Sequence, residues 1–208
     1  MSMRSALLSG ISLLCFVLYS PVYASAQNTE KASKQIFNEY LEYLTLPNVA
    51  TQSSPDIQKV AEWTAKKYSQ YGLRTQLLEN NGQPMLYADY MQAGEDAPTL
   101  LLYAHMDGQP VNAELWEQDS PWQPVLKIEE NDSWVEKPLS LLDKDYDPNW
   151  RIFARSAGDD KAPIIALQSA LKALAEAGIE PSVNLKVFLE GEEEEPKKTQ
   201  QIQKVKKK

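Results

Sequence analysis

Apolar residues recur along the chain with two different spacings, and each spacing predicts one kind of element. Apolar side chains every three or four positions predict helices over 29–44, 56–71 and 160–177. Alternating or continuous apolar runs predict strands over 73–79, 84–90, 100–104, 125–128, 133–136, 151–154 and 183–189. Helices and strands mixed along one chain in this way predict an α/β fold.

The stretch 99–111, TLLLYAHMDGQPV, contains the strand around which the rest is organised. Its unbroken apolar run from Leu100 to Ala104 predicts a strand buried on both faces, as in a parallel sheet. The run stops at His105, the only histidine in the chain, and Asp107 follows two residues later. Loops just beyond the carboxyl ends of such strands build the active sites of open α/β sheets. We therefore expect the chemistry of this protein to lie near His105.

Two acidic clusters flank other predicted elements. Asp159 and Asp160 lie where the helix over 160–177 begins, and four glutamates at 192–195 follow the strand over 183–189. Acids at a helix start are usually caps that interact with the helix dipole. A run of glutamates is usually a solvated surface patch. A single histidine is more often an ordinary surface or core residue than a metal ligand. The common position of the three spots at element ends leads to our hypothesis that they converge on a metal ion.

The residue types suit hydrolytic metal chemistry. Residues two apart on an extended segment share a side, so Asp107 is placed to orient the ring of His105, as carboxylates do for metal-binding histidines. A carboxylate at 159 or 160 can bridge two ions about 3.5–4 Å apart, the spacing of two-metal hydrolases. Within the glutamate run, one carboxylate would bind metal and its neighbour would serve as general base.

Composition narrows the function classes. The chain has 208 residues, 43% of them hydrophobic, and a formal net charge of −8. This is enough chain for one domain with a core, and the negative charge argues against a nucleic-acid or anionic-membrane partner. The single cysteine, Cys15, lies in the N-terminal apolar run, so the remaining chain offers metal only imidazole and carboxylate ligands.

Residues 1–26 have the pattern of a signal peptide. Arg4 precedes an apolar stretch, 6–19, that is too short to span a bilayer, and small residues allow cleavage after Ala24 or Ala26. Cleavage would remove Arg4 and change the net charge from −8 to −9. We expect a periplasmic or secreted protein without stable membrane insertion; the alternative is an uncleaved membrane anchor.

Four motifs between about Ile36 and Glu194 resemble one family. They are YAHMDGQPV, ELWEQDSPWQPV, RSAGDDKAP and FLEGEEE. Together they resemble the two-zinc metallopeptidases and deacylases that include carnosinase-type dipeptidases, glutamate carboxypeptidase and aminoacylase. The tryptophan-proline loop is most similar to the dipeptidase branch. The resemblance implies a mixed, largely parallel α/β sheet with helices on both faces, and hydrolysis of a peptide or acyl-amide bond.

The resemblance also implies roles for individual residues. His105, Asp159 and Glu194 would be metal ligands, with Asp159 bridging the two zinc ions of the family. Asp107 would orient His105, and Glu193 would be the general base. The register of base and ligand within Glu192–Glu195 is the least constrained of these assignments. The implied substrate is a small peptide or an N-acyl amino acid.

The chain departs from the family in two respects. Ser156 and Ala162 stand where the family usually has glycine, which would affect the backbone near Asp159. Family members are also about twice as long or more and supply a second histidine. We therefore expect a C-terminally truncated chain, with a signal peptide at 1–26, the N-terminal part of a catalytic domain at 27–195, and a disordered lysine- and glutamine-rich tail at 196–208.

Truncation leaves three interpretations. The chain is an exported zinc dipeptidase or related hydrolase with partial zinc occupancy, an inactive fragment that binds at most one metal ion, or a peptide-binding domain without catalysis. The sequence does not decide whether the chain associates with itself.

Overall fold

The computed structural model describes residues 34–51, 55–79, 82–144 and 146–194. The signal peptide predicted at 1–26 and the tail predicted at 196–208 lie outside these residues. Among the described helices, none has the length and apolar character needed to cross a bilayer.

The elements follow the predicted order closely. A first helix covers residues 34–44. The other helices and the strands are α2 (Asp56–Gln70), β1 (Arg74–Leu78), β2 (Met85–Tyr90), β3 (Thr99–His105), β4 (Val125–Glu130), β5 (Ser133–Lys137), β6 (Arg151–Phe153), α3 (Ala162–Ala177) and β7 (Asn184–Glu190). Short helical turns lie at Ala113–Leu115, Leu139–Asp143 and Ala157–Lys161.

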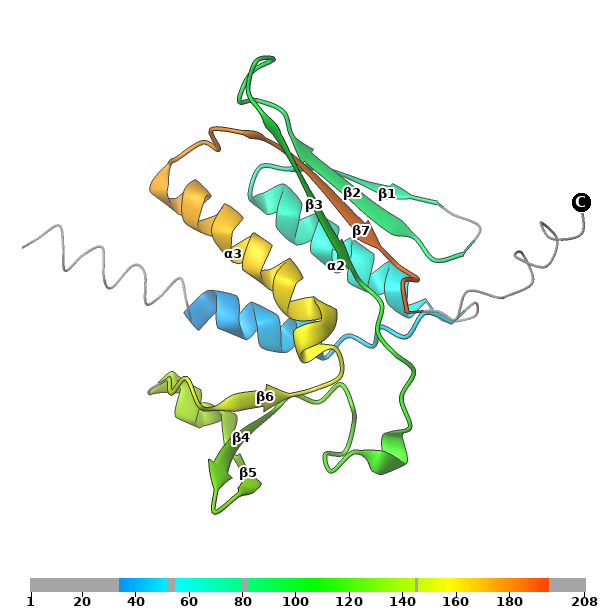
Figure 1. Cartoon of the computed structure of the whole chain (residues 1–208), viewed down its shortest axis with the longest axis vertical. Helices are drawn as coiled ribbons and strands as arrows, with labels where there is room; N and C mark the ends of the chain where they lie inside the picture. The colour runs from blue at the N-terminus through cyan, green and yellow to red at the C-terminus, as the bar shows by residue number, and fades with distance from the viewer. Residues whose placement is uncertain (1–33, 52–54, 80–81, 145, 195–208) are drawn as a thin grey trace, which may run out of the picture.

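The strands form two sheets (Figure 1). The larger has the order β1-β2-β7-β3, and the smaller, β5-β4-β6, lies beside the first helix and the start of α3. In the larger sheet β3 and β7 are parallel, while β1–β2 and β2–β7 are antiparallel. The mixed α/β class is thus confirmed, but only one of these three pairings is parallel, where a largely parallel sheet was expected.

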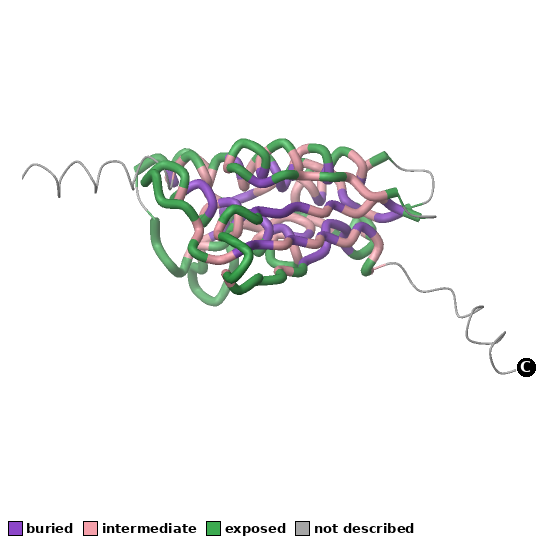
Figure 2. Tube along the Cα trace, turned by 90° about the horizontal axis from the view of Figure 1, so that it is seen from above, coloured by how far each residue is buried: buried purple, intermediate pink, exposed green. Residues whose placement is uncertain are grey.

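One face of the larger sheet carries the core. Leu185, Val187 and Leu189 on β7 are almost fully buried against the helices. The helices α2 and α3 are in direct contact, since the Tyr68 hydroxyl donates to the Ile164 carbonyl (3.2 Å). Buried segments therefore run through the middle of the molecule and exposed ones lie along its outside (Figure 2). The described helices all pack on this one face of the larger sheet. The prediction of helices on both faces is therefore not met by the described residues.

The position of β3 corrects a prediction. Its apolar run indicated a strand buried on both faces, but among the described strands β3 lies at the edge of the larger sheet. Leu100, Leu101 and Tyr103 are 49%, 65% and 57% exposed. The prediction failed because apolar composition reports what a strand can bury and not which neighbours it has.

A buried lysine joins α3 to the first helix. The side chain of Lys161 is 1% exposed, and its ammonium donates to the carbonyls of Tyr43 (3.0 Å), Leu44 (3.3 Å) and Leu46 (2.6 Å). These carbonyls lie at the end of the first helix, where backbone acceptors have no intrahelical partner. Lys161 therefore caps that helix from the start of α3.

Lys161→Met is expected to destabilise the fold, because the carbonyls of Tyr43, Leu44 and Leu46 lose the donor that Lys161 supplies, although that of Tyr43 keeps the N–H of Leu46. We expect a loss of about 3 kcal/mol and a fall in Tm of roughly 6–12 °C. The matched control is Lys59→Met, which removes a lysine that is 60% exposed and lies 3.8 Å from Asp56. Thermal unfolding followed by circular dichroism should show almost no shift for the control. Equal Tm values for both variants would contradict the capping role.

Candidate metal centre

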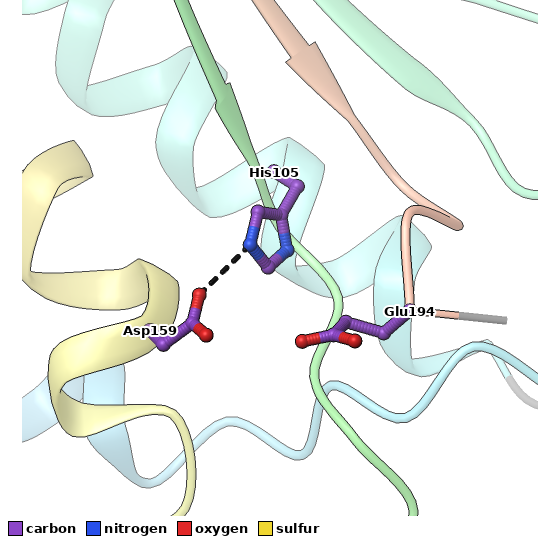
Figure 3. Close-up of side chains that lie close together, drawn as sticks. All are labelled: His105, Asp159 and Glu194. Atoms are coloured by element: carbon purple, nitrogen blue, oxygen red, sulfur yellow. Dashed lines mark hydrogen bonds and ion pairs between the residues drawn. The ribbon is translucent and has the colours of Figure 1, made fainter.

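Three side chains from distant parts of the sequence converge beyond the end of β3. His105, Asp159 and Glu194 each offer one ligand atom, and these atoms lie within 4.8 Å of one another. The Nε2 atom of His105 is 2.9 Å from an Asp159 carboxylate oxygen. Figure 3 shows the ring of His105 between the two carboxylates, with all three side chains directed into the same space. The structure thus brings together the three residues that the sequence proposed as ligands.

Parallel pairing of β3 and β7 explains why two of them meet. His105 is in register with Glu190, so both strands end at the same edge of the sheet. The backbone N–H of Met106 donates to the Glu190 carbonyl (2.6 Å) and extends the pairing one residue further. The segment after β7 then carries Glu194 past the end of β3. This is the edge where parallel strands place functional loops.

Asp159 and Asp160 do not act as helix caps. Both have non-helical backbone angles, the peptide bond between them is cis, and neither side chain caps α3, which begins at Ala162. The Asp159 side chain reaches His105 Nε2 instead, and Asp160 accepts the backbone N–H of His105 (3.1 Å). The capping alternative is therefore wrong, and Asp160, to which the sequence gave no definite role, fixes the end of β3.

Asp107 contacts two parts of the site from a fully buried position. One carboxylate oxygen lies 3.3 Å from His105 Nδ1, which is also 3.1 Å from the Asp107 carbonyl. The same carboxylate accepts the backbone N–H groups of Glu193 (3.1 Å) and Glu194 (2.8 Å). Burial raises the pKa of Asp107, and these two backbone hydrogen bonds partly oppose the rise. Asp107 thus lies where it can orient His105, and it also holds the glutamate segment in place.

The electrostatics of His105 favour a positive charge at Nε2. Burial lowers the pKa of His105, but the hydrogen bond to Asp159 and the charges of Asp160 and Asp107 outweigh burial, so the net pKa is raised. Metal binding needs the neutral imidazole. A proton therefore competes with metal for Nε2, and metal affinity should fall as the pH falls through the pKa of His105.

Ser156, which stands where the resembled family usually has glycine, keeps a backbone conformation typical of glycine and uses its hydroxyl in a hydrogen bond. It has a left-handed backbone conformation (φ 61°), which is uncommon for a residue with a side chain. Its hydroxyl bonds with the side chain of Asn48 (Nδ2–Oγ 3.1 Å). The Asn48 amide also donates to the Met106 carbonyl (2.9 Å), and the Asn48 carbonyl accepts the Gly108 N–H (2.8 Å). A methyl group at Gly108 would lie 2.1 Å from the Ser156 hydroxyl. The close approach of the segments around Gly108 and Ser156 therefore requires glycine at position 108.

Glu193, the proposed general base, precedes Glu194 in the chain and is not one of the three residues whose ligand atoms converge. Its side chain is exposed, and its backbone is fixed by Asp107. Glu194 is held from a second side by the amide of Gln109, a residue to which the sequence analysis assigned no role. The only sequence signal for Gln109 was its position in the loop after His105.

Comparison with known proteins identifies the family. Residues 101–201 match the sequence model of peptidase family M20/M25/M40. The chain carries part of an M20 peptidase domain. It is 27% identical over 162 residues to the Cys-Gly metallodipeptidase dug1 of Schizosaccharomyces pombe, a match that covers 73% of this chain and 30% of dug1. The family resemblance drawn from the motifs is thereby confirmed.

Solved M20 structures share the fold. The M20 metallo-carboxypeptidase Sso-CP2 of Sulfolobus solfataricus is 25% identical with a TM-score of 0.57, over 76% of this chain and 31% of that protein. The dipeptidase Dug1p of Saccharomyces cerevisiae is 18% identical with a TM-score of 0.61, over 86% of this chain and 36% of that protein. This M20 chain thus spans about a third of the length of these relatives.

The donor set of the M20 chain fits a divalent metal ion. One imidazole nitrogen and two carboxylate oxygens are ligands that zinc accepts, and three protein ligands leave positions open for water and substrate. The contact of His105 Nδ1 with a buried carboxylate is the arrangement that fixes a ligating imidazole in its tautomer. His105, Asp159 and Glu194 would hold the ion, with Asp107 behind His105.

Proposed function

We propose that this chain is a zinc-dependent M20 hydrolase that cleaves small peptides or N-acyl amino acids, with dipeptides as the first class to test. The observation that carries the proposal is the convergence of His105, Asp159 and Glu194 within 4.8 Å, with Asp107 behind the imidazole. The dug1 relative, named a metallodipeptidase, supports the choice of dipeptides.

The residues divide the reaction between them. A bound zinc ion would polarise the scissile carbonyl and make water more acidic. Glu193 would take a proton from the attacking water as the new C–O bond forms. It would return that proton to the amine nitrogen as the C–N bond breaks, so that a carboxylic acid and an amine leave. Asp107 would keep His105 in the tautomer that presents Nε2, and Gln109 would hold Glu194.

Export is a separate part of the proposal and depends on residues 1–26. Their charged start, apolar core and small-residue cleavage sites support a signal peptide and a periplasmic or secreted product. N-terminal sequencing of the exported protein should find a start at Ser25 or Gln27. A protein that retains residues 1–26 would contradict export with cleavage.

Metal removal tests the hydrolase proposal. The purified chain is stripped with a chelator, its zinc content is measured, and a panel of dipeptides and N-acyl amino acids is assayed before stripping, after stripping and after zinc is restored. We expect turnover that disappears with the metal and returns with zinc. Turnover that persists without metal would contradict the metal-dependent mechanism.

Two further results would favour the alternatives. A folded chain that binds zinc without turnover on any substrate would indicate an inactive fragment. A folded chain that binds no metal but still binds peptides would indicate a peptide-binding domain. The observation that gives these outcomes weight is that His105 is the only histidine in the chain.

A further inference from the structure

Asn48 lies fully buried between the two segments that carry His105 and Asp159. It belongs to the stretch between the first helix and α2, far from both residues in the chain. Its side-chain Nδ2 donates to the Met106 carbonyl (2.9 Å) and to the Ser156 hydroxyl (3.1 Å). One amide thus contacts both the backbone that follows β3 and the segment that leads into α3.

On the side of β3, Asn48 bonds with both chain neighbours of Asp107. Its side chain donates to the carbonyl of Met106, the residue before Asp107. Its backbone carbonyl accepts the N–H of Gly108, the residue after Asp107 (2.8 Å). The backbone on either side of Asp107 is therefore fixed, and so is the carboxylate that lies 3.3 Å from His105 Nδ1.

The position of Asp159 depends on its backbone. Its side chain is 78% exposed, so packing around the carboxylate does not fix it. Two contacts attach its segment to the end of β3: Asp160 accepts the His105 N–H (3.1 Å), and Ser156 bonds with Asn48. One attachment would leave the two segments free to pivot about it, whereas two attachments define their relative orientation. The contact between Asn48 and Ser156 therefore helps to set how the Asp159 carboxylate approaches His105 Nε2.

The surroundings of Asn48 use both the donor and the acceptor of its amide. Nδ2 has two N–H groups, and the Met106 carbonyl and the Ser156 hydroxyl accept from it. Oδ1 lies 3.3 Å from the same hydroxyl, which can donate to it, and 3.5 Å from Trp122 Nε1. A residue without an amide at position 48 would leave buried polar groups without these partners, which is costly.

We propose that Asn48 is a positioning residue of the metal centre. It holds the end of β3, with His105 and Asp107, in a fixed orientation to the segment that carries Asp159. It does not bind the ion itself, because its amide already bonds with the protein and the three converging ligand atoms belong to other residues. The inference rests on the proposed metal-dependent function and adds to it a residue far from the ligands in the chain.

Zinc affinity of the full-length chain, measured by competition with a chromogenic chelator, tests the proposal. We expect Asn48→Ala to bind zinc about tenfold more weakly than the wild type, the lower end of the loss that follows removal of an outer contact of a metal site. The visible spectrum of bound Co²⁺ should change as well, because it reports the geometry of the ligands. An asparagine with a purely structural role would lower Tm and leave both readouts unchanged.

Asn184→Ala is the matched control, because it removes a second buried asparagine far from the ligands. Asn184 is 2% exposed, and its amide donates to the Gly94 carbonyl (2.8 Å). It begins β7, whereas the metal centre lies beyond the other end of that strand. Both variants lose buried hydrogen bonds, so both should lower Tm, but only Asn48→Ala should weaken zinc binding. Wild-type zinc affinity in Asn48→Ala, or an equal loss in both variants, would overturn the inference.

Ser156→Gly keeps the proposal testable if Asn48→Ala fails to fold. Glycine readily adopts the left-handed backbone found at Ser156, and the change removes the hydroxyl that contacts Asn48. Zinc binding should weaken in this variant too. The double variant should bind zinc no more weakly than Asn48→Ala alone, because both changes break the same contact. Losses that simply add, or wild-type zinc affinity in Ser156→Gly, would overturn the inference.

Hydrogen exchange of the metal-free chain separates this inference from the proposed function. In chelator, Asn48→Ala should speed amide exchange in residues 105–109 and 155–161, and Asn184→Ala should not. Unchanged exchange in both segments would overturn the positioning role even where zinc binds and dipeptides are cleaved. A wild type that binds no zinc would instead overturn the metal centre, and with it both the proposed function and this inference.

Discussion

His105→Ala should abolish metal binding, the largest effect that we expect of any substitution in this chain. The variant loses the only imidazole and leaves two carboxylates, of which Asp159 has a side chain that is 78% exposed. Loss of a partner behind a metal ligand already costs about 10–100-fold in affinity. Loss of the ligand itself should cost more than about a hundredfold, as measured by competition with a chromogenic chelator.

The control for His105→Ala is Asp119→Asn, which removes an exposed acid from the loop after β3. Its zinc affinity should match that of the wild type. Zinc binding by His105→Ala with wild-type affinity would show that the ion lies elsewhere. Circular dichroism of both variants checks that the fold is kept, since His105 is buried and contacts Asp107.

Glu193→Gln should lower kcat about 10²–10⁴-fold while zinc binding stays unchanged. The amide cannot accept the proton of water, and a positioned general base contributes a factor of this size. The backbone N–H of Glu193 bonds to Asp107 whatever the side chain, so the segment and the proposed ligand Glu194 should keep their positions. The measurement is kcat on the best dipeptide substrate together with the zinc content of the same sample.

Glu129→Gln is the matched control for the base, since Glu129 is an exposed glutamate on β4 in the smaller sheet. It should retain full activity. If Glu193→Gln retains activity while a neighbouring variant, Glu192→Gln, loses it, the register within the glutamate run is wrong by one residue. The assignment of Glu194 as a ligand would then need to be tested again.

The sequence predicted the local elements well because each has a strong local signal. The sixteen-residue helix α3 ends at Gly178, which has the left-handed conformation expected of a helix stop. The burial of β3 depends instead on which strands pair with it. The local sequence of a strand does not show which other strands will be its neighbours. The same reason explains why the sheet is less parallel than expected.

At the metal centre, the sequence predicted residue types better than contacts. Positions at element ends pointed to His105 and to two acidic clusters, the family resemblance singled out Asp159 and Glu194 within them, and the structure brings these three residues together. Their roles remain predictions. The contacts of Asp107 with the backbone of Glu193 and Glu194 were not foreseen, because they join segments more than eighty residues apart. The contacts of Gln109 and Asn48 were not predicted for a similar reason, because isolated glutamine and asparagine residues form no recognisable sequence motif.

The parallel pairing of β3 with β7 has a consequence for the order of folding. It joins Ala104 to Leu189, which are 85 positions apart, so a long loop must close before the pair forms. Contacts of such separation slow folding. His105 and Glu194 meet only after this closure, so a newly made chain would complete the proposed metal site late. Zinc uptake during refolding should therefore report the slowest step of sheet assembly and lag behind the appearance of helical signal.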